Sequence, residues 1–253
     1  MLRNRRIGCS VSGVAQFITK NGLGELKDWL EDGYDVIKEW DTKYSDWFAV
    51  PRSIKTTSVK PSGTVSLLAG ATPGLHYPES RFYIRRIRLS KHSELIEPMK
   101  KAGYKIEPAF GSEDTTSVVE VPVDVGEGIR TASELSIWEQ FSLAAFMQRH
   151  WADNQVSCTV TFNPETEGDE ISHVLNYFQY HLKGISLLPR HDYGAYKQMP
   201  YESIDENEYK KQVSKLSKLS FGVIKNEEAE IDKFCNNDRC AVSYTHLRAH
   251  ETS

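Results

Sequence analysis

The sequence is poor in the features that mark membrane, secreted and polyanion-binding proteins. It contains no run of about eighteen apolar residues, so no segment is predicted to span a membrane. Four cysteines in 253 residues are too few for a disulfide-rich secreted domain, which favours a reducing compartment such as the cytoplasm. The 31 Lys and Arg residues nearly balance the 35 Asp and Glu residues, which argues against a surface for nucleic acid or membrane.

Periodic hydrophobic segments, by contrast, are plentiful and alternate between two periods. A spacing typical of amphipathic helices predicts helices over residues 23–44, 93–103, 131–151 and 169–183. Alternating or β-branched runs predict strands over residues 53–60, 115–123, 155–162 and 184–189, the last of them short and buried. This order predicts an α/β fold. Residues 201–234 are highly charged and predict a surface helix that leads into a loose tail.

Residues 59–78, VKPSGTVSLLAGATPGLHYP, concentrate glycine and proline directly after a predicted strand. Gly63 permits a positive φ angle or close backbone approach, and Ser62 and Thr64 offer hydroxyls. A short helix that starts here would present free backbone amides, which suit a phosphate. The glycine spacing matches neither a P-loop nor a dinucleotide fingerprint. The residues alone therefore leave two interpretations, a phosphate site or an ordinary capped turn.

The cysteines and one arginine cluster offer further candidate groups. Cys235 and Cys240 are five positions apart and can close a small disulfide ring if the chain turns between them, but a zinc site would need further ligands and no paired Cys or His lies nearby at metal-ligand spacing. Cys9 and Cys158 are interpreted as structural, as is His76, and no metal site is predicted. The arginines of RFYIRRIR could hold a triphosphate or form a solvated, salt-bridged strand edge; they are Arg81, Arg85, Arg86 and Arg88.

Four segments together resemble a known family. They are NRRIGCSVSGVAQF (4–17), the run from Asp46 to Arg88, DNQVSCTVTF (153–162) and KGISLLP (183–189). In this order they resemble the C-terminal part of adenosylcobalamin-dependent (class II) ribonucleoside-triphosphate reductases, and most closely their monomeric type. The resemblance implies the C-terminal part of a ten-stranded α/β barrel with a mobile C-terminal tail. It also implies that ribonucleotides are converted to 2′-deoxyribonucleotides through a cobalamin-initiated thiyl radical.

The resemblance assigns roles to two groups of residues. In this family the loop that matches Pro61, Ser62, Gly63, Thr64, Val65 and Ser66 holds the phosphates of the ribonucleoside triphosphate. A C-terminal cysteine pair, matched here by Cys235 and Cys240, re-reduces the active-site disulfide and exchanges with a thioredoxin-like reductant.

The family's Asn-Pro-Cys-Gly-Glu segment, which carries the radical cysteine, is not found in this sequence. It is expected upstream, together with the deoxynucleotide effector site and most of the adenosylcobalamin platform, so the chain is expected to be inactive alone. The expected division is barrel over 1–215, flexible tail with the cysteine pair over 216–241, and non-native sequence over 242–253, which resembles a translated adapter. The alternatives are a non-catalytic α/β nucleotide- or phosphate-binding module and a fragment of another reductase class.

Overall fold

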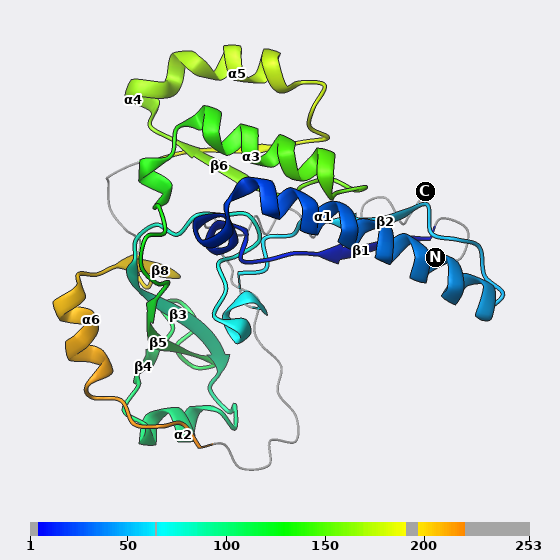
Figure 1. Ribbon diagram of the computed structural model, residues 1–253. Helices are drawn as coiled ribbons and strands as arrows, with labels where there is room; N and C mark the ends of the chain where they lie inside the picture. Colours follow the sequence, from blue (N-terminus) through cyan, green and yellow to red (C-terminus); the bar gives the residue numbers. More distant parts are fainter. Residues whose placement is uncertain (1–4, 64, 191–196, 221–253) are drawn as a thin grey trace. The chain divides into compact units, whose positions relative to one another are not determined.

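The computed structural model describes residues 5–63, 65–190 and 197–220, and these divide into two compact units (Figure 1). Unit 1 contains the described residues of 5–78 and 128–190, and unit 2 contains those of 79–127 and 197–220. The predicted features that lie outside the described residues are Thr64, the predicted tail beyond residue 220 with Cys235 and Cys240, and the segment 242–253.

Unit 1 is built from parallel strands joined by helices. Strand β1 (Arg6–Ser10) pairs in parallel with β2 (Lys55–Ser58), and β6 (Thr159–Phe162) pairs in parallel with β7 (Ser186–Pro189). A parallel bridge between Val59 and Val156 links the chain after β2 to the chain before β6. Helix α1 (Val14–Trp47) connects the first pair, and the second is connected by α4 (Pro164–Glu167), η4 (Gly168–Glu170) and α5 (Ile171–Phe178). Parallel pairs require such crossovers, so the predicted alternation of strand and helix is found here.

A glycine kink and two capping boxes set where the helical segments of unit 1 begin. Helix α1 is interrupted at Gly22, whose φ of 84° lies in the left-handed region, and the predicted helix over 23–44 follows this kink. The predicted helix over 131–151 is wrong at its start. Thr131 and Glu134 form a capping box on a short turn, η3 (Ala132–Glu134), and α3 (Ile137–His150) begins with a second box between Ser136 and Glu139.

The core of unit 1 lies between these helices and the strands. One buried cluster joins Leu26 and Leu30 of α1 to Met147 and Trp151 at the end of α3, over Val59 beside the strands. A second cluster packs α3 against α5 and β6; its buried members are Ile137, Phe141, Val160, Phe162, Val174 and Phe178. Strand β7 is less buried than predicted, because Ser186 and Leu188 are exposed on it. Helix α5 is shorter than predicted and ends at Phe178.

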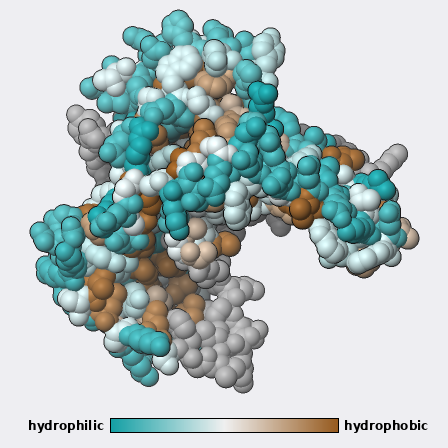
Figure 2. All heavy atoms as spheres, viewed as in Figure 1, coloured by the Kyte–Doolittle hydropathy of each residue, from teal (hydrophilic) through white to brown (hydrophobic). Residues whose placement is uncertain are grey.

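Unit 2 is an antiparallel sheet with the strand order β4-β5-β3-β8. The two long strands β3 (Phe82–Ser90) and β5 (Thr116–Asp124) pair along their whole length, flanked by β4 (Lys105–Pro108) and β8 (Tyr201–Ser203). Helix α2 (Ile96–Lys101) follows β3, and α6 (Glu206–Val213) follows β8. The outer side of α6 is hydrophilic in Figure 2, as predicted for a surface helix.

The predicted strand edge at RFYIRRIR is therefore wrong, because β3 is an inner strand with neighbours on both sides. Arg85 and Arg88, expected to be solvated, are buried. Among the helices of the described ranges, none is long and apolar enough to cross a lipid bilayer.

Candidate phosphate-binding site

The loop that follows β2 holds the predicted phosphate-binding residues. A five-residue 3-10 helix, η2 (Val65–Ala69), begins there, and the Ser66 amide donates to the Ser62 carbonyl at 2.9 Å. Gly63 is buried, and Pro61 and Ser62 are half-buried. Ser66 is only 3% exposed, whereas Val65 is 70% exposed. Five of the six predicted residues are thus brought together in one turn, and Thr64 lies outside the described residues.

Ser62 adopts the left-handed backbone conformation that was one of the two features expected of Gly63. Its φ is 52°, a region that residues other than glycine enter only when their surroundings hold them there. The hydroxyl is held from two sides: Ser62 Oγ accepts from the Gly74 amide at 2.9 Å and lies 2.6 Å from Ser12 Oγ. Backbone strain maintained in this way is typical of ligand-binding turns.

Several hydrogen-bond donors of this turn are without acceptors in the part of the chain that the structure describes. The amides of Ser62 and Gly63 donate no hydrogen bond there. The buried Ser66 hydroxyl also has no hydrogen-bond partner among the described residues. Buried polar groups are nearly always paired, so these donors call for a partner. A turn with two successive amides and a hydroxyl that have no acceptor among the described residues has the donors that bind an anion.

The start of α1 holds the other end of the loop. The Gly13 amide donates to the Thr72 carbonyl at 2.8 Å, and the Gln16 side chain accepts from the Thr72 amide at 2.9 Å and donates to the Gly70 carbonyl at 3.0 Å. Gly74 must be glycine, because a Cβ atom there would lie 2.6 Å from the Lys60 carbonyl oxygen. Sequence reasoning missed Ser12 and Gln16. The one signal was the run SVSGVAQF, polar residues placed directly before an amphipathic helix.

His76, next to this loop, is structural as predicted. Its Nε2 accepts from the Thr159 amide at 3.1 Å, and Nδ1 donates to the Pro73 carbonyl at 3.2 Å. Both ring nitrogens are thereby used.

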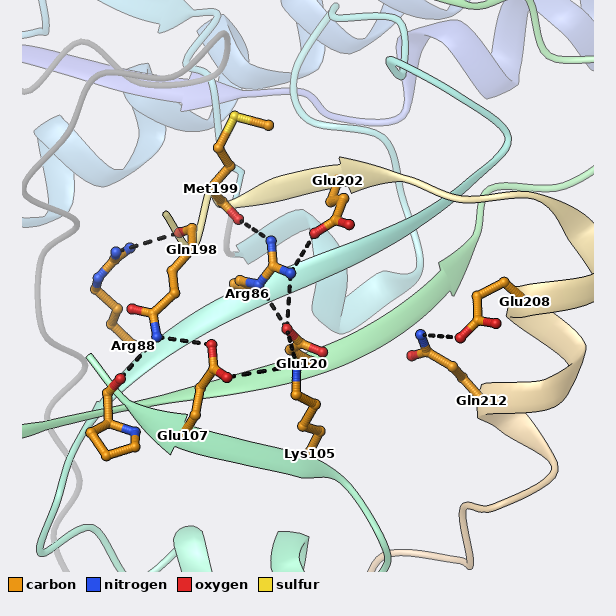
Figure 3. Close-up of polar contacts among 11 residues, drawn as sticks. Arg86, Arg88, Lys105, Glu107, Glu120, Gln198, Met199, Glu202, Glu208 and Gln212 are labelled. Carbon is orange, nitrogen blue, oxygen red and sulfur yellow. Dashed lines mark hydrogen bonds and ion pairs between the residues drawn. The ribbon is translucent and has the colours of Figure 1, made fainter. Parts of the chain in front are cut away.

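The arginines of RFYIRRIR form contacts within unit 2, and those of Arg86 and Arg88 are drawn in Figure 3. Arg86 contacts the carboxylates of Glu120 and Glu202 and donates to the Met199 carbonyl at 3.1 Å. Burial opposes its charge, but the hydrogen bonds to Glu202 and Glu120 outweigh burial and raise the pKa of Arg86. Arg81 pairs with Asp124 at 3.3 Å. These contacts favour the structural interpretation over triphosphate binding.

Comparisons with known proteins decide the family. No protein-family model matches the chain. The chain is 56% identical over 245 residues to an adenosylcobalamin-dependent ribonucleoside-triphosphate reductase of Euglena gracilis, covering 95% of this chain and 34% of the relative. Over the residues that it spans, the chain belongs to this reductase family. A reductase of the same name from Levilactobacillus brevis is 39% identical over 237 residues, covering 82% of this chain and 31% of the relative.

A solved structure supports the same family at the level of the fold. The crystal structure of a B12-dependent class II ribonucleotide reductase matches with a TM-score of 0.74 and 33% identity, over 88% of this chain and 34% of that one. The predicted α/β fold, as part of a reductase barrel, is confirmed by this likeness. The chain spans about a third of the length of the curated reductases that it matches.

Proposed function

We propose that this chain supplies the substrate-phosphate loop of an adenosylcobalamin-dependent reductase that converts ribonucleoside triphosphates to 2′-deoxyribonucleotides. The observation that carries the proposal is the turn at Ser62, where a left-handed serine sits among donors that have no acceptor in the described part of the chain. The relatives' names supply the reaction and the cofactor.

Each residue of the loop has a physical role in this proposal. The amides of Ser62 and Gly63 donate to phosphate oxygens, and the hydroxyl of Ser66 adds a third donor. Pro61 ends the run of backbone donors before the turn, because it has no N–H group. Val65 points its apolar side chain to the exterior, which leaves the turn itself to backbone and hydroxyl groups. A triphosphate carries enough acceptor oxygens to satisfy all three donors.

The remaining parts of the reaction are assigned by the family. Adenosylcobalamin supplies the radical when it is bound. Within the described ranges, no cluster of three His, Cys, Asp or Glu side chains could hold a metal ion. Cys235 and Cys240 are proposed to carry electrons from a thioredoxin-like protein to the active site, which suits a reducing compartment such as the cytoplasm. Deoxynucleotide effectors are assigned to parts of the relatives that this chain does not span.

Calorimetric titration of the full chain with inorganic triphosphate tests the phosphate role. We expect saturable binding that the Ser66→Ala variant weakens about fivefold, the effect of one ordinary hydrogen bond. Thr19→Ala is the matched control, because the hydrogen bond that Thr19 Oγ1 donates lies within α1, to the Ala15 carbonyl at 2.9 Å. Binding that is equal in wild type and Ser66→Ala would contradict the assignment.

A further inference from the structure

Ser12 and Ser62 form a hydroxyl pair that joins the start of α1 to the phosphate loop. Their Oγ atoms lie 2.6 Å apart although fifty positions separate them in the sequence. Ser12 directly precedes Gly13, the N-cap residue of α1, and the next residues, Val14 and Ala15, are buried. The pair therefore fixes the turn at Ser62 to a well-anchored helix end.

The direction of the hydrogen bond between Ser12 and Ser62 decides whether the Ser62 hydroxyl can donate to another group. A serine hydroxyl has one hydrogen and can accept two hydrogen bonds. Ser62 Oγ already accepts from the Gly74 amide. If Ser12 donates to Ser62, both acceptor positions of Ser62 are used and its own hydrogen must go to another group. If Ser62 donates to Ser12 instead, its hydrogen is used within the pair.

We propose that Ser12 is a positioning residue for phosphate binding: its hydroxyl donates to Ser62 Oγ and so leaves the Ser62 hydroxyl to donate to a phosphate oxygen. This inference rests on the proposed function of the loop. Successive hydrogen bonds polarise one another, so the chain from Ser12 through Ser62 to an anion makes Ser62 a stronger donor than an isolated serine. Ser12 itself is exposed and acts through Ser62.

The loop has a second anchor that provides a matched control. Ser10 Oγ accepts from the Lys60 amide at 2.9 Å, one residue before Pro61. Ser10 thus holds the same segment as Ser12 but makes no contact with the Ser62 hydroxyl. If anchoring alone matters, the loss of either serine should weaken binding alike.

Titration of the full chain with inorganic triphosphate, combined with thermal unfolding, separates these cases. We expect Ser12→Ala to raise the Kd about fivefold with little change in melting temperature, because Ser12 is exposed. Ser12→Thr should bind like wild type, since it keeps the hydroxyl. The double variant Ser12→Ala/Ser62→Ala should bind no more weakly than Ser62→Ala, because Ser12 acts only through Ser62. Ser10→Ala should leave the Kd unchanged.

Each other outcome overturns a defined statement. Equal losses in Ser10→Ala and Ser12→Ala, or additive losses in the double variant, would show that Ser12 only anchors the loop. A weakened Ser62→Ala with an unaffected Ser12→Ala would overturn the role of Ser12 and leave the proposed function standing. Unaffected binding in Ser62→Ala would remove the phosphate role of the Ser62 hydroxyl, and the role of Ser12 with it.

Discussion

Arg86 and Glu120 face each other across the antiparallel pair of β3 and β5, with Arg86 Nε 2.9 Å from Glu120 Oε1. Lys105 Nζ reaches the same carboxylate oxygen at 3.1 Å from β4. Glu120 is only 4% exposed. Its carboxylate is paired with two cations, Arg86 on β3 and Lys105 on β4, the strands on either side of β5. Charges placed in this way hold three strands of the sheet in one register.

Replacing Arg86 with methionine should destabilise unit 2 by about 3 kcal/mol, because a buried carboxylate loses its principal partner. Tryptophan fluorescence cannot report this change, since all five tryptophans lie in unit 1. The measurement is amide hydrogen exchange of peptides from β3 and β5, which should become faster while the tryptophan signal of unit 1 stays unchanged.

Two further variants control for the loss of side-chain packing at Arg86. Arg86→Met/Glu120→Leu should exchange more slowly than Arg86→Met, because the unpaired charge is removed with its partner. Glu202→Gln should have a smaller effect, since Glu202 is 47% exposed on its side chain. Faster exchange in the double variant than in the single one would exclude buried charge as the cause.

The error at β3 shows which part of the fold the sequence does not reveal. Several arginines on one strand are typical of an exposed edge, which is one of the two interpretations that RFYIRRIR allows. The partners that bury Arg86 lie on other strands, Glu120 at 34 positions away and Glu202 at 116. Local patterns predicted helices and strands well because helix and strand periods are local, whereas charge compensation across a sheet depends on distant pairing.

At the candidate site, too, local patterns predicted the local structure but not the contacts between distant residues. The concentration of glycine and proline after a strand predicted the turn, whereas the phosphate-binding role that the resemblance implies stays a prediction. No sequence pattern connects Ser12 with Ser62, and none places a positive φ at a serine that glycine follows. Both depend on the helix start and the 70–74 segment meeting at one point, which is a result of tertiary packing.

The two described cysteines should differ sharply in reactivity. Burial raises the pKa of Cys158 to about 12, so about one thiol in ten thousand is ionised at pH 8. Cys9 is exposed on β1. In a Cys235→Ser/Cys240→Ser background, a thiol reagent at pH 8 should modify one cysteine rapidly, identified as Cys9 by peptide mapping, and Cys158 only after denaturant is added. Rapid modification of Cys158 in the native chain would contradict its burial.

Glu139 should make the stability of unit 1 depend on pH. Hydrogen bonds from Arg130, the Ser136 amide and the Ser136 hydroxyl lower its pKa to about 2 from 4.5. The stabilisation is therefore complete above pH 4.5 and is lost as the pH falls toward 2. It amounts to at most about 1 kcal/mol, because the Glu139 side chain is 45% exposed.

Unfolding of unit 1, followed by tryptophan fluorescence between pH 5 and pH 2, measures this dependence. Glu139→Gln keeps the capping-box geometry but cannot ionise, so its stability should fall less steeply with acid than that of wild type. Arg130→Met should also flatten the profile, because Arg130 makes the largest contribution to the lowered pKa. Parallel profiles for all three proteins would show that Glu139 does not contribute.

Substitutions at two glycines of the loop can distinguish the effect of a positive φ from the effect of close packing. Gly70 and Gly74 both have a positive φ, of 61° and 51°, but a Cβ atom at Gly74 would lie 2.6 Å from the Lys60 carbonyl oxygen, whereas one at Gly70 would contact nothing within 4 Å. Gly70→Ala should therefore cost only the conformational penalty, roughly 1 kcal/mol of stability, and keep triphosphate binding. Gly74→Ala must move the backbone of Lys60 and residue 74 apart, and the amide of residue 74 is the donor to Ser62 Oγ. Its triphosphate Kd should therefore rise at least about tenfold, the loss of more than one hydrogen bond. Calorimetry on both variants decides the matter: equal affinities would show that the contact between Gly74 and Lys60 does not shape the phosphate loop.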